Sequence, residues 1–173
     1  MESFFEVLKF ILPAGLVFLT ALYSIKYFLN NESRKRLEDL RMANQKIITP
    51  LRLQAYERVV LFLERVSPSG LILRVNKNGM SAQLLHAELV RTIRDEFEHN
   101  LSQQVYMSAP AWEKVMNAKE ETIRIINIAF GKQKPNASSI DLAQEIFTIC
   151  SSLDKLPTRL AIDVIKKEVA QVF

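Results

Sequence analysis

Residues 81–101 read SAQLLHAELVRTIRDEFEHNL, and this stretch decides the fold class. Its large apolar residues recur every four positions, at Leu85, Leu89, Ile93, Phe97 and Leu101. This spacing places them on one face of an α-helix, while charged residues fill the opposite face. Ser81 precedes the stripe and is a typical N-cap residue. The stretch therefore predicts an amphipathic helix that packs against a core.

Comparable stripes lie on both sides of this helix. Before it, Thr49-Pro50 predicts a new helix start, with threonine as the N-cap and proline at the first helical position. After it, helices are predicted to begin at 108–110, at Ser138 or Ser139, and at Pro157, and Gly131 is predicted to cap the first of these. The residues predicted to face inward are Leu53, Tyr56, Val59, Val60, Leu63, Val66, Trp112, Val115, Met116, Ile123, Ile126, Phe130, Ala143, Ile146, Phe147, Cys150, Leu153, Leu160, Ala161, Val164, Ile165, Val169 and Val172.

The expected fold of residues 50–173 is a compact all-α bundle of about five helices joined by short loops. Four glycines and six prolines among 173 residues are too few for sandwiches or propellers. Two short stretches, 71–75 and 103–107, fit either a helix or a short strand, and the pattern does not choose between them.

The N-terminal segment is predicted to be a transmembrane helix. No residue from Phe10 to Ile25 is charged, and as a helix this run is roughly 24 Å long against a hydrocarbon core of about 30 Å. Lys9 and Lys26 can snorkel to the interfaces. A cleaved signal peptide and a buried core helix are the competing interpretations. The first lacks a basic start and a cleavage site, and the second would show a single stripe. The anchor residues are Phe10, Ile11, Leu12, Leu16, Val17, Phe18, Leu19, Leu22 and Ile25.

The flanking charges predict the direction of this anchor. Basic residues gather after the apolar run, at Lys26, Arg34, Lys35, Arg36 and Arg41. Lysine and arginine mark the cytoplasmic side, so we expect the N-terminus outside and the following residues in the cytoplasm. The same side chains are expected to contact anionic lipid. The expected organisation is an anchor at 1–29, a basic juxtamembrane stalk at 30–49 and a cytoplasmic domain at 50–173, located at the cytoplasmic (inner) membrane.

The positive charge of the chain is local. The formal net charge is +4, and residues 34–58 alone hold seven basic and three acidic side chains. Residues 59–173 hold 14 basic and 13 acidic side chains. A nucleic-acid-binding domain carries its positive charge on the folded part, so nucleic acid is not the expected partner.

The sequence holds no recognisable catalytic set. Nucleotide-binding glycine motifs and a G-x-S-x-G elbow are absent, and the one cysteine, Cys150, allows neither an intramolecular disulfide nor a cysteine-based zinc site. Glu96 and His99 have the Glu-x-x-His spacing of di-iron bundles, and Glu64 is a further candidate ligand. A second such motif is missing, however, so a solvated histidine is the ordinary interpretation of His99. We therefore expect no cofactor, no metal and no enzymatic activity.

Residues 49–65 (TPLRLQAYERVVLFLER) and 91–104 (RTIRDEFEHNLSQQ) resemble an uncharacterised family of bacterial single-pass helical membrane proteins. The resemblance covers most of the chain and implies the architecture above, but no activity or site residues. The expected function is a membrane-tethered helical interaction module, such as a scaffold, adaptor or accessory subunit, whose protein partner is undefined. Two alternatives stay open: a metal-binding or enzymatic bundle, and a ribosome or nucleic-acid tether that uses the basic stalk. A homo-oligomer is compatible with the sequence.

Overall fold

The structure is a computed structural model of the chain, and it describes the backbone of residues 2–172 and the side chains of residues 13 and 15–171. The chain divides into two units, Met1–Thr49 and Pro50–Phe173. Within residues 2–172 all regular structure is helical, and strands are absent. The predicted all-α class is therefore confirmed for this part of the chain.

The first unit consists of the N-terminal part of one long helix, α1 (Glu2–Arg65). Of the helices that the structure describes, none is long and apolar enough to cross a membrane. The predicted transmembrane anchor, and with it the single-pass location at the cytoplasmic membrane, is therefore wrong. The physical reason is that Lys9 and Lys26 confine the uncharged run to roughly 24 Å, and that the polar residues Thr20 and Ser24 dilute its hydropathy.

The described anchor residues are exposed. Their side chains are 48–67% exposed, at Leu16, Val17, Phe18, Leu19, Leu22 and Ile25. The side chains of Phe10, Ile11 and Leu12 lie outside the described residues.

The predicted helix start at Thr49-Pro50 is also wrong, because α1 continues through both residues. Proline has no backbone N–H, so the carbonyl of Lys46 loses its helical donor at this point. Helix formers on both sides, with apolar residues that pack from Ala55 onward, outweigh this local loss.

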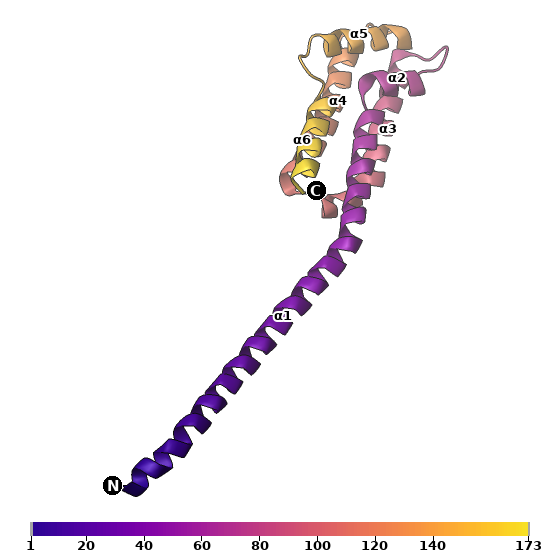
Figure 1. Cartoon of the computed structure of the whole chain (residues 1–173). Helices are drawn as coiled ribbons and strands as arrows, with labels where there is room; N and C mark the ends of the chain where they lie inside the picture. The colour runs from indigo at the N-terminus through magenta and orange to yellow at the C-terminus, as the bar shows by residue number, and fades with distance from the viewer. Residues whose placement is uncertain (1, 173) are drawn as a thin grey trace. The chain divides into compact units, whose positions relative to one another are not determined.

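The second unit is a bundle of helices closed at one end by α5 (Figure 1). After the last turns of α1, the chain forms α2 (Pro68–Val75), α3 (Ala82–Asn100), the 3₁₀ helix η1 (Leu101–Tyr106), α4 (Ala109–Gly131), α5 (Ser139–Ser151) and α6 (Pro157–Val172). Both stretches that the sequence left open are thus helical, 71–75 within α2 and 103–106 within η1. Helix α4 packs against α3, α5 and α6, which makes it the central helix of the unit.

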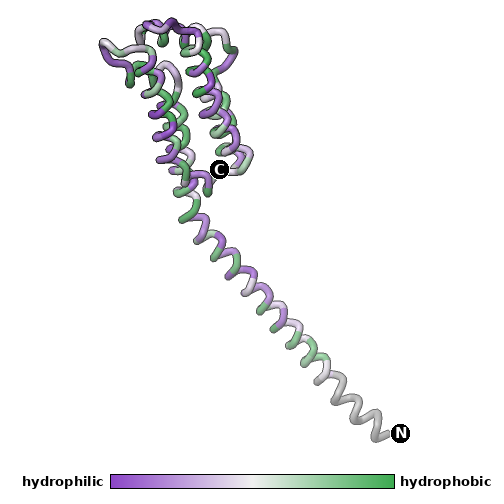
Figure 2. The backbone as a smooth tube through the Cα atoms, turned by 180° about the vertical axis from the view of Figure 1, so that it is seen from behind, coloured by the Kyte–Doolittle hydropathy of each residue, from purple (hydrophilic) through white to green (hydrophobic). Residues whose placement is uncertain are grey.

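One continuous core holds these helices together. In Figure 2 hydrophobic and hydrophilic residues alternate along the helices of this unit, as in amphipathic helices. Every α-helix contributes side chains with less than 2% exposure: Val59, Phe62, Leu63, Leu71, Leu85, Leu89, Ile93, Ile126, Leu142, Ile146, Ile162 and Ile165. At its centre the ring of Phe97 lies 5.8 Å from Phe62 and 5.6 Å from Trp112, between centroids. This core fixes the helices relative to one another, and with them the side chains on their exposed faces.

The predicted starts of three helices are confirmed, and of the two candidates Ser138 and Ser139 it is Ser138 that caps α5. The hydroxyl oxygens of Ser81, Ser108 and Ser138 accept hydrogen bonds from backbone N–H groups in the first turns of α3, α4 and α5. The caps of α3 and α5 also touch each other, because Ala82 N–H donates to the carbonyl of Ala137 and Ser139 N–H donates to the carbonyl of Met80, both at 3.0 Å. Gly131 is not a cap, because it is the last helical residue of α4 and the positive φ in the described chain belongs to Gly79, at 82°.

The capping box of α5 is expected to contribute to stability. Ser138 N–H donates to Asp141 Oδ2 at 2.8 Å, while Asp141 N–H donates to Ser138 Oγ at 3.3 Å. We expect Ser138→Ala to lower the free energy of unfolding by about 1 kcal/mol, because the first turn loses its acceptor. Urea unfolding followed by the fluorescence of Trp112 measures this. Ser151→Ala, in the last turn of the same helix, is the control, and an equal loss in both variants would contradict the assignment.

Candidate functional site

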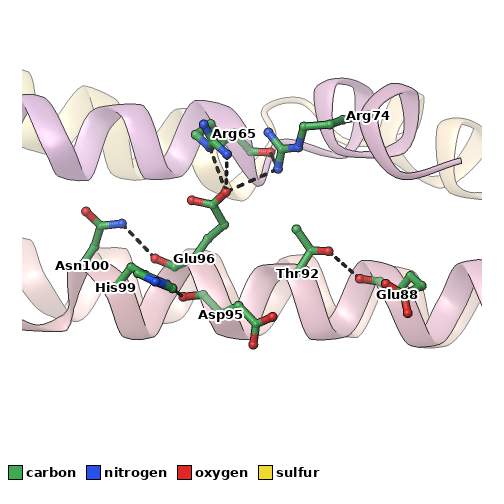
Figure 3. Close-up of polar contacts among 8 residues, drawn as sticks. All are labelled: Arg65, Arg74, Glu88, Thr92, Asp95, Glu96, His99 and Asn100. Carbon is green, nitrogen blue, oxygen red and sulfur yellow. Dashed lines mark hydrogen bonds and ion pairs between the residues drawn. The ribbon is translucent and has the colours of Figure 1, made fainter.

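Glu96 on α3 lies against two arginines (Figure 3), and it also lines a shallow open pocket of about 690 Å³. Its Oε1 accepts from Arg65 Nε at 2.8 Å and from Arg65 Nη2 at 2.5 Å, and Arg74 Nη2 lies 3.8 Å away. Arg74 also donates to the backbone carbonyl of Arg65 at 3.3 Å. These contacts connect α1, α2 and α3, so this carboxylate joins helices and has little remaining capacity for a metal ion.

His99 lines the same pocket as Glu96, but its ring contacts the backbone of its own helix rather than the Glu96 carboxylate. Its Nδ1 lies 2.7 Å from the backbone carbonyl of Asp95, one turn earlier on α3, and the side chain is exposed (Figure 3). Glu64, the third candidate ligand, accepts from Arg159 Nη1 at 3.1 Å. Within the part of the chain that the structure describes, no three histidine, cysteine or carboxylate side chains are grouped so that they could hold a metal ion.

The basic residues of the predicted stalk are exposed. Arg36 Nε lies 3.3 Å from Glu32 Oε1, and both side chains remain largely in solvent. The others, Lys26, Arg34, Lys35 and Arg41, are exposed as well. No contact in the structure tests their predicted role in topology or lipid binding.

The second unit carries an apolar groove between α4 and α6. Its volume is about 680 Å³, and it is lined by residues of α4, by the end of α5 and the loop after it, and by the start of α6. The floor is buried, with Ala118, Ile125 and Ala161 at 3%, 6% and 2% exposure. The walls are exposed, with Ile128, Leu153 and Leu160 at 45%, 39% and 51%. Exposed apolar side chains above a buried apolar floor are typical of a binding surface.

The sequence pattern did not locate this groove. Leu153 and Leu160 continue the apolar stripes of their helices, but the prediction that they face inward is wrong, since both are exposed. The same prediction is also wrong for Leu53, Met116 and Phe147, at 43%, 39% and 40% exposure. The sequence feature that indicates the groove lies in α4, where Ile125 and Ile128 extend the apolar surface beyond a single stripe. A helix with two apolar faces can bury both of them only by packing against elements on both sides. Part of the second apolar face of α4 is exposed to solvent.

A polar centre lies where the end of α6 meets the start of α4. The carboxylate of Glu168 accepts from Tyr56 Oη at 2.6 Å, from the N–H of Ser108 at 3.0 Å and from the hydroxyl of Ser108. Arg52 donates to Tyr56 Oη at 3.1 Å and to the carbonyl of Tyr106 at 3.2 Å. This Glu168 centre connects α1, η1, α4 and α6, and it ties α6 to the helix that forms the other wall of the groove.

The same contacts shift two pKa values in opposite directions. Desolvation alone would raise the pKa of Glu168, but hydrogen bonds from Ser108 and Tyr56, together with the charge of Arg52, outweigh it and hold that pKa below its ordinary value. Burial and the hydrogen bond to Glu168 raise the pKa of Tyr56. The ionised carboxylate and the neutral phenol are thus the forms that the folded chain stabilises.

This centre predicts a loss of stability in acid. Because the pKa of Glu168 is lower in the folded chain, its contribution is fully present above the unfolded-state pKa of about 4.3 and disappears as the pH falls through the folded pKa. We therefore expect the difference in unfolding free energy between the native chain and Glu168→Gln to be constant near neutral pH and to shrink below pH 4 or so. Urea unfolding at a series of pH values measures it, since the other carboxylates titrate in both chains. A difference that is independent of pH would contradict this role of Glu168.

Comparisons with known proteins give a family but no activity. The profile of one family, described as a family of unknown function (DUF7935), matches residues 2–172. No curated protein and no solved structure gives a significant match to the sequence.

Proposed function

Because the chain belongs to the DUF7935 family of unknown function, we propose from its geometry that it is a protein-interaction module whose α4–α6 groove binds a helix of a partner protein. The observation that carries the proposal is the groove itself, with a buried apolar floor and exposed apolar walls. The bacterial origin that the resemblance implies stays a prediction.

The dimensions of the groove favour a helical segment as the ligand. On α4 its lining runs from Lys114 to Ile128, which at the helical rise of about 1.5 Å per residue is a length of roughly 21 Å. A helix of about 14 residues has this length. Its apolar residues at i, i+3, i+4 and i+7 would meet the walls formed by Ile128 and Leu160, as in other helix-in-groove complexes. The volume is also compatible with a small apolar ligand, but such a ligand would leave much of the α4 wall uncovered.

The test compares three forms of the full-length chain, tagged and expressed in its own cells. In the groove variant, Ile128→Asp and Leu160→Asp place charges in both walls. In the control variant, Leu73→Asp alters a side chain of α2 that is 81% exposed and does not line the groove. All three should unfold at the same urea concentration, because the altered residues are exposed.

We expect the native chain and the Leu73→Asp control to recover the same stoichiometric partner, and the groove variant to recover it at least about tenfold less, because two charges would be buried at the interface. A photo-crosslinking residue in place of Leu160 should join the chain to that partner. Equal recovery by the groove variant would overturn the proposal, and so would the absence of any stoichiometric partner of the native chain.

A further inference from the structure

We infer that the helix bound in the groove is acidic along its flanks and belongs to a protein other than a second copy of this chain. The inference rests on the proposed function, and it names the partner by its charge. Its basis is the rim of the groove, where three basic side chains, Lys114, Arg124 and Lys155, accompany one acidic side chain, Glu121.

This charge is a local property of the groove. Residues 59–173 hold 14 basic and 13 acidic side chains, so the surface as a whole is balanced. The three basic groups lie at separate points of the rim, with Lys114 and Arg124 ten residues apart on α4 and Lys155 in the loop between α5 and α6. A ligand helix seated in the groove would therefore meet positive charge from α4 and from the loop between α5 and α6.

These basic groups are available to a partner. Lys114 is exposed and forms no ion pair with the residues that the structure describes. Arg124 contacts Glu121 at 3.1 Å with 68% of its side chain exposed, and Lys155 contacts Asp163 at 3.3 Å with 54% exposed. Exposed pairs of this kind contribute at most about 1 kcal/mol, so carboxylates on the ligand can compete for them. Complementary charges around an apolar contact set which partner is selected.

The same charges argue against self-association through the groove. The exposed apolar part of α1, residues 16–29, contains Lys26 and no acidic residue, and residues 34–58 hold seven basic against three acidic side chains. Either segment of a second copy would bring positive charge to a positive rim. Like charges brought together at an interface disfavour the wrong partner.

The experiment selects ligands for the full-length chain from a displayed library of 18-residue helical peptides. Apolar residues are fixed at i, i+3, i+4 and i+7 positions, and the flanking positions vary among Glu, Lys, Gln and Ala. The same selection is run on the Ile128→Asp/Leu160→Asp groove variant and on a charge-reversed variant, Lys114→Glu/Arg124→Glu.

We expect the native chain to enrich peptides with several more Glu than Lys at the flanking positions, and the charge-reversed variant to enrich the opposite. Peptides synthesised from the acidic pool should bind the native chain about tenfold more tightly than matched versions with Lys in place of Glu, and the difference should shrink at high salt. Enrichment without a charge preference, or the same preference in both variants, would overturn the inference and leave the proposed function standing. No enrichment over the groove variant would overturn both.

Discussion

Replacing Phe62 with alanine is expected to lower the free energy of unfolding by about 3–5 kcal/mol, the largest effect of any single change considered. Phe62 is 1% exposed, and its ring lies 5.8 Å from that of Phe97, which in turn stacks on Trp112. Truncation removes the apolar contacts and leaves a cavity between α1 and α3 that close-packed neighbours can fill only in part.

Urea unfolding followed by Trp112 fluorescence measures this effect, because Trp112 is the only tryptophan and lies in the core of the second unit. Leu61→Ala is the matched control, since Leu61 is the preceding residue of α1 and is 56% exposed. We expect the control to change stability by less than about 1 kcal/mol. A similar loss in both variants would mean that α1 does not contribute to the core through Phe62.

The second large effect is expected for Glu168→Ala, which should lower the free energy of unfolding by about 2–3 kcal/mol at neutral pH. Tyr56, at 3% exposure, loses the acceptor of its hydroxyl, and the N–H of Ser108 loses its acceptor at the start of α4. Hydrogen bonds to a charged group contribute more than neutral ones, and an unmatched buried donor adds its own cost.

The Glu168→Gln variant separates the loss of hydrogen bonds to a charged group from the cost of an unmatched buried donor. The amide oxygen of the glutamine can still accept one hydrogen bond. Glu168→Gln should therefore lower the free energy of unfolding by less than Glu168→Ala does. Lys167→Ala, at the neighbouring exposed position, is the control and should change stability by at most about 0.5 kcal/mol. If Glu168→Ala lowered the free energy of unfolding no more than Lys167→Ala does, the Glu168 centre would be an ordinary surface contact.

The helices of the second unit could be predicted from the sequence because their signals are local. Ser81, Ser108 and Ser138 each satisfy the N–H group three residues ahead, and Pro157 starts α6, so a few adjacent residues are enough to place each start. The fourfold spacing of Leu85, Leu89 and Ile93 similarly identifies the buried face of α3, and all three are fully buried.

The features that the sequence did not reveal depend on contacts between distant residues. Leu160 continues an apolar stripe, and whether that stripe is covered depends on how α6 sits beside α4. Glu168 looked like one of many surface carboxylates, because Tyr56 and Ser108 are far from it in sequence. The Glu-x-x-His spacing of Glu96 and His99 is present, yet Arg65 occupies the carboxylate. At the N-terminus the uncharged run is too short for a membrane crossing, although its lack of charge resembles that of a transmembrane helix.

The contact between the caps of α3 and α5 has a consequence for the exchange of backbone hydrogens. Amide groups in the first turn of a helix usually exchange rapidly with solvent, because they lack a helical acceptor. Here the amides of Ala82 and Ser139 each donate to a carbonyl of the other segment, and these segments lie at the starts of α3 and α5, which pack against each other. We therefore expect both amides to exchange slowly and at matching rates, which reflect cooperative opening of the contact between α3 and α5 rather than fraying of either helix end.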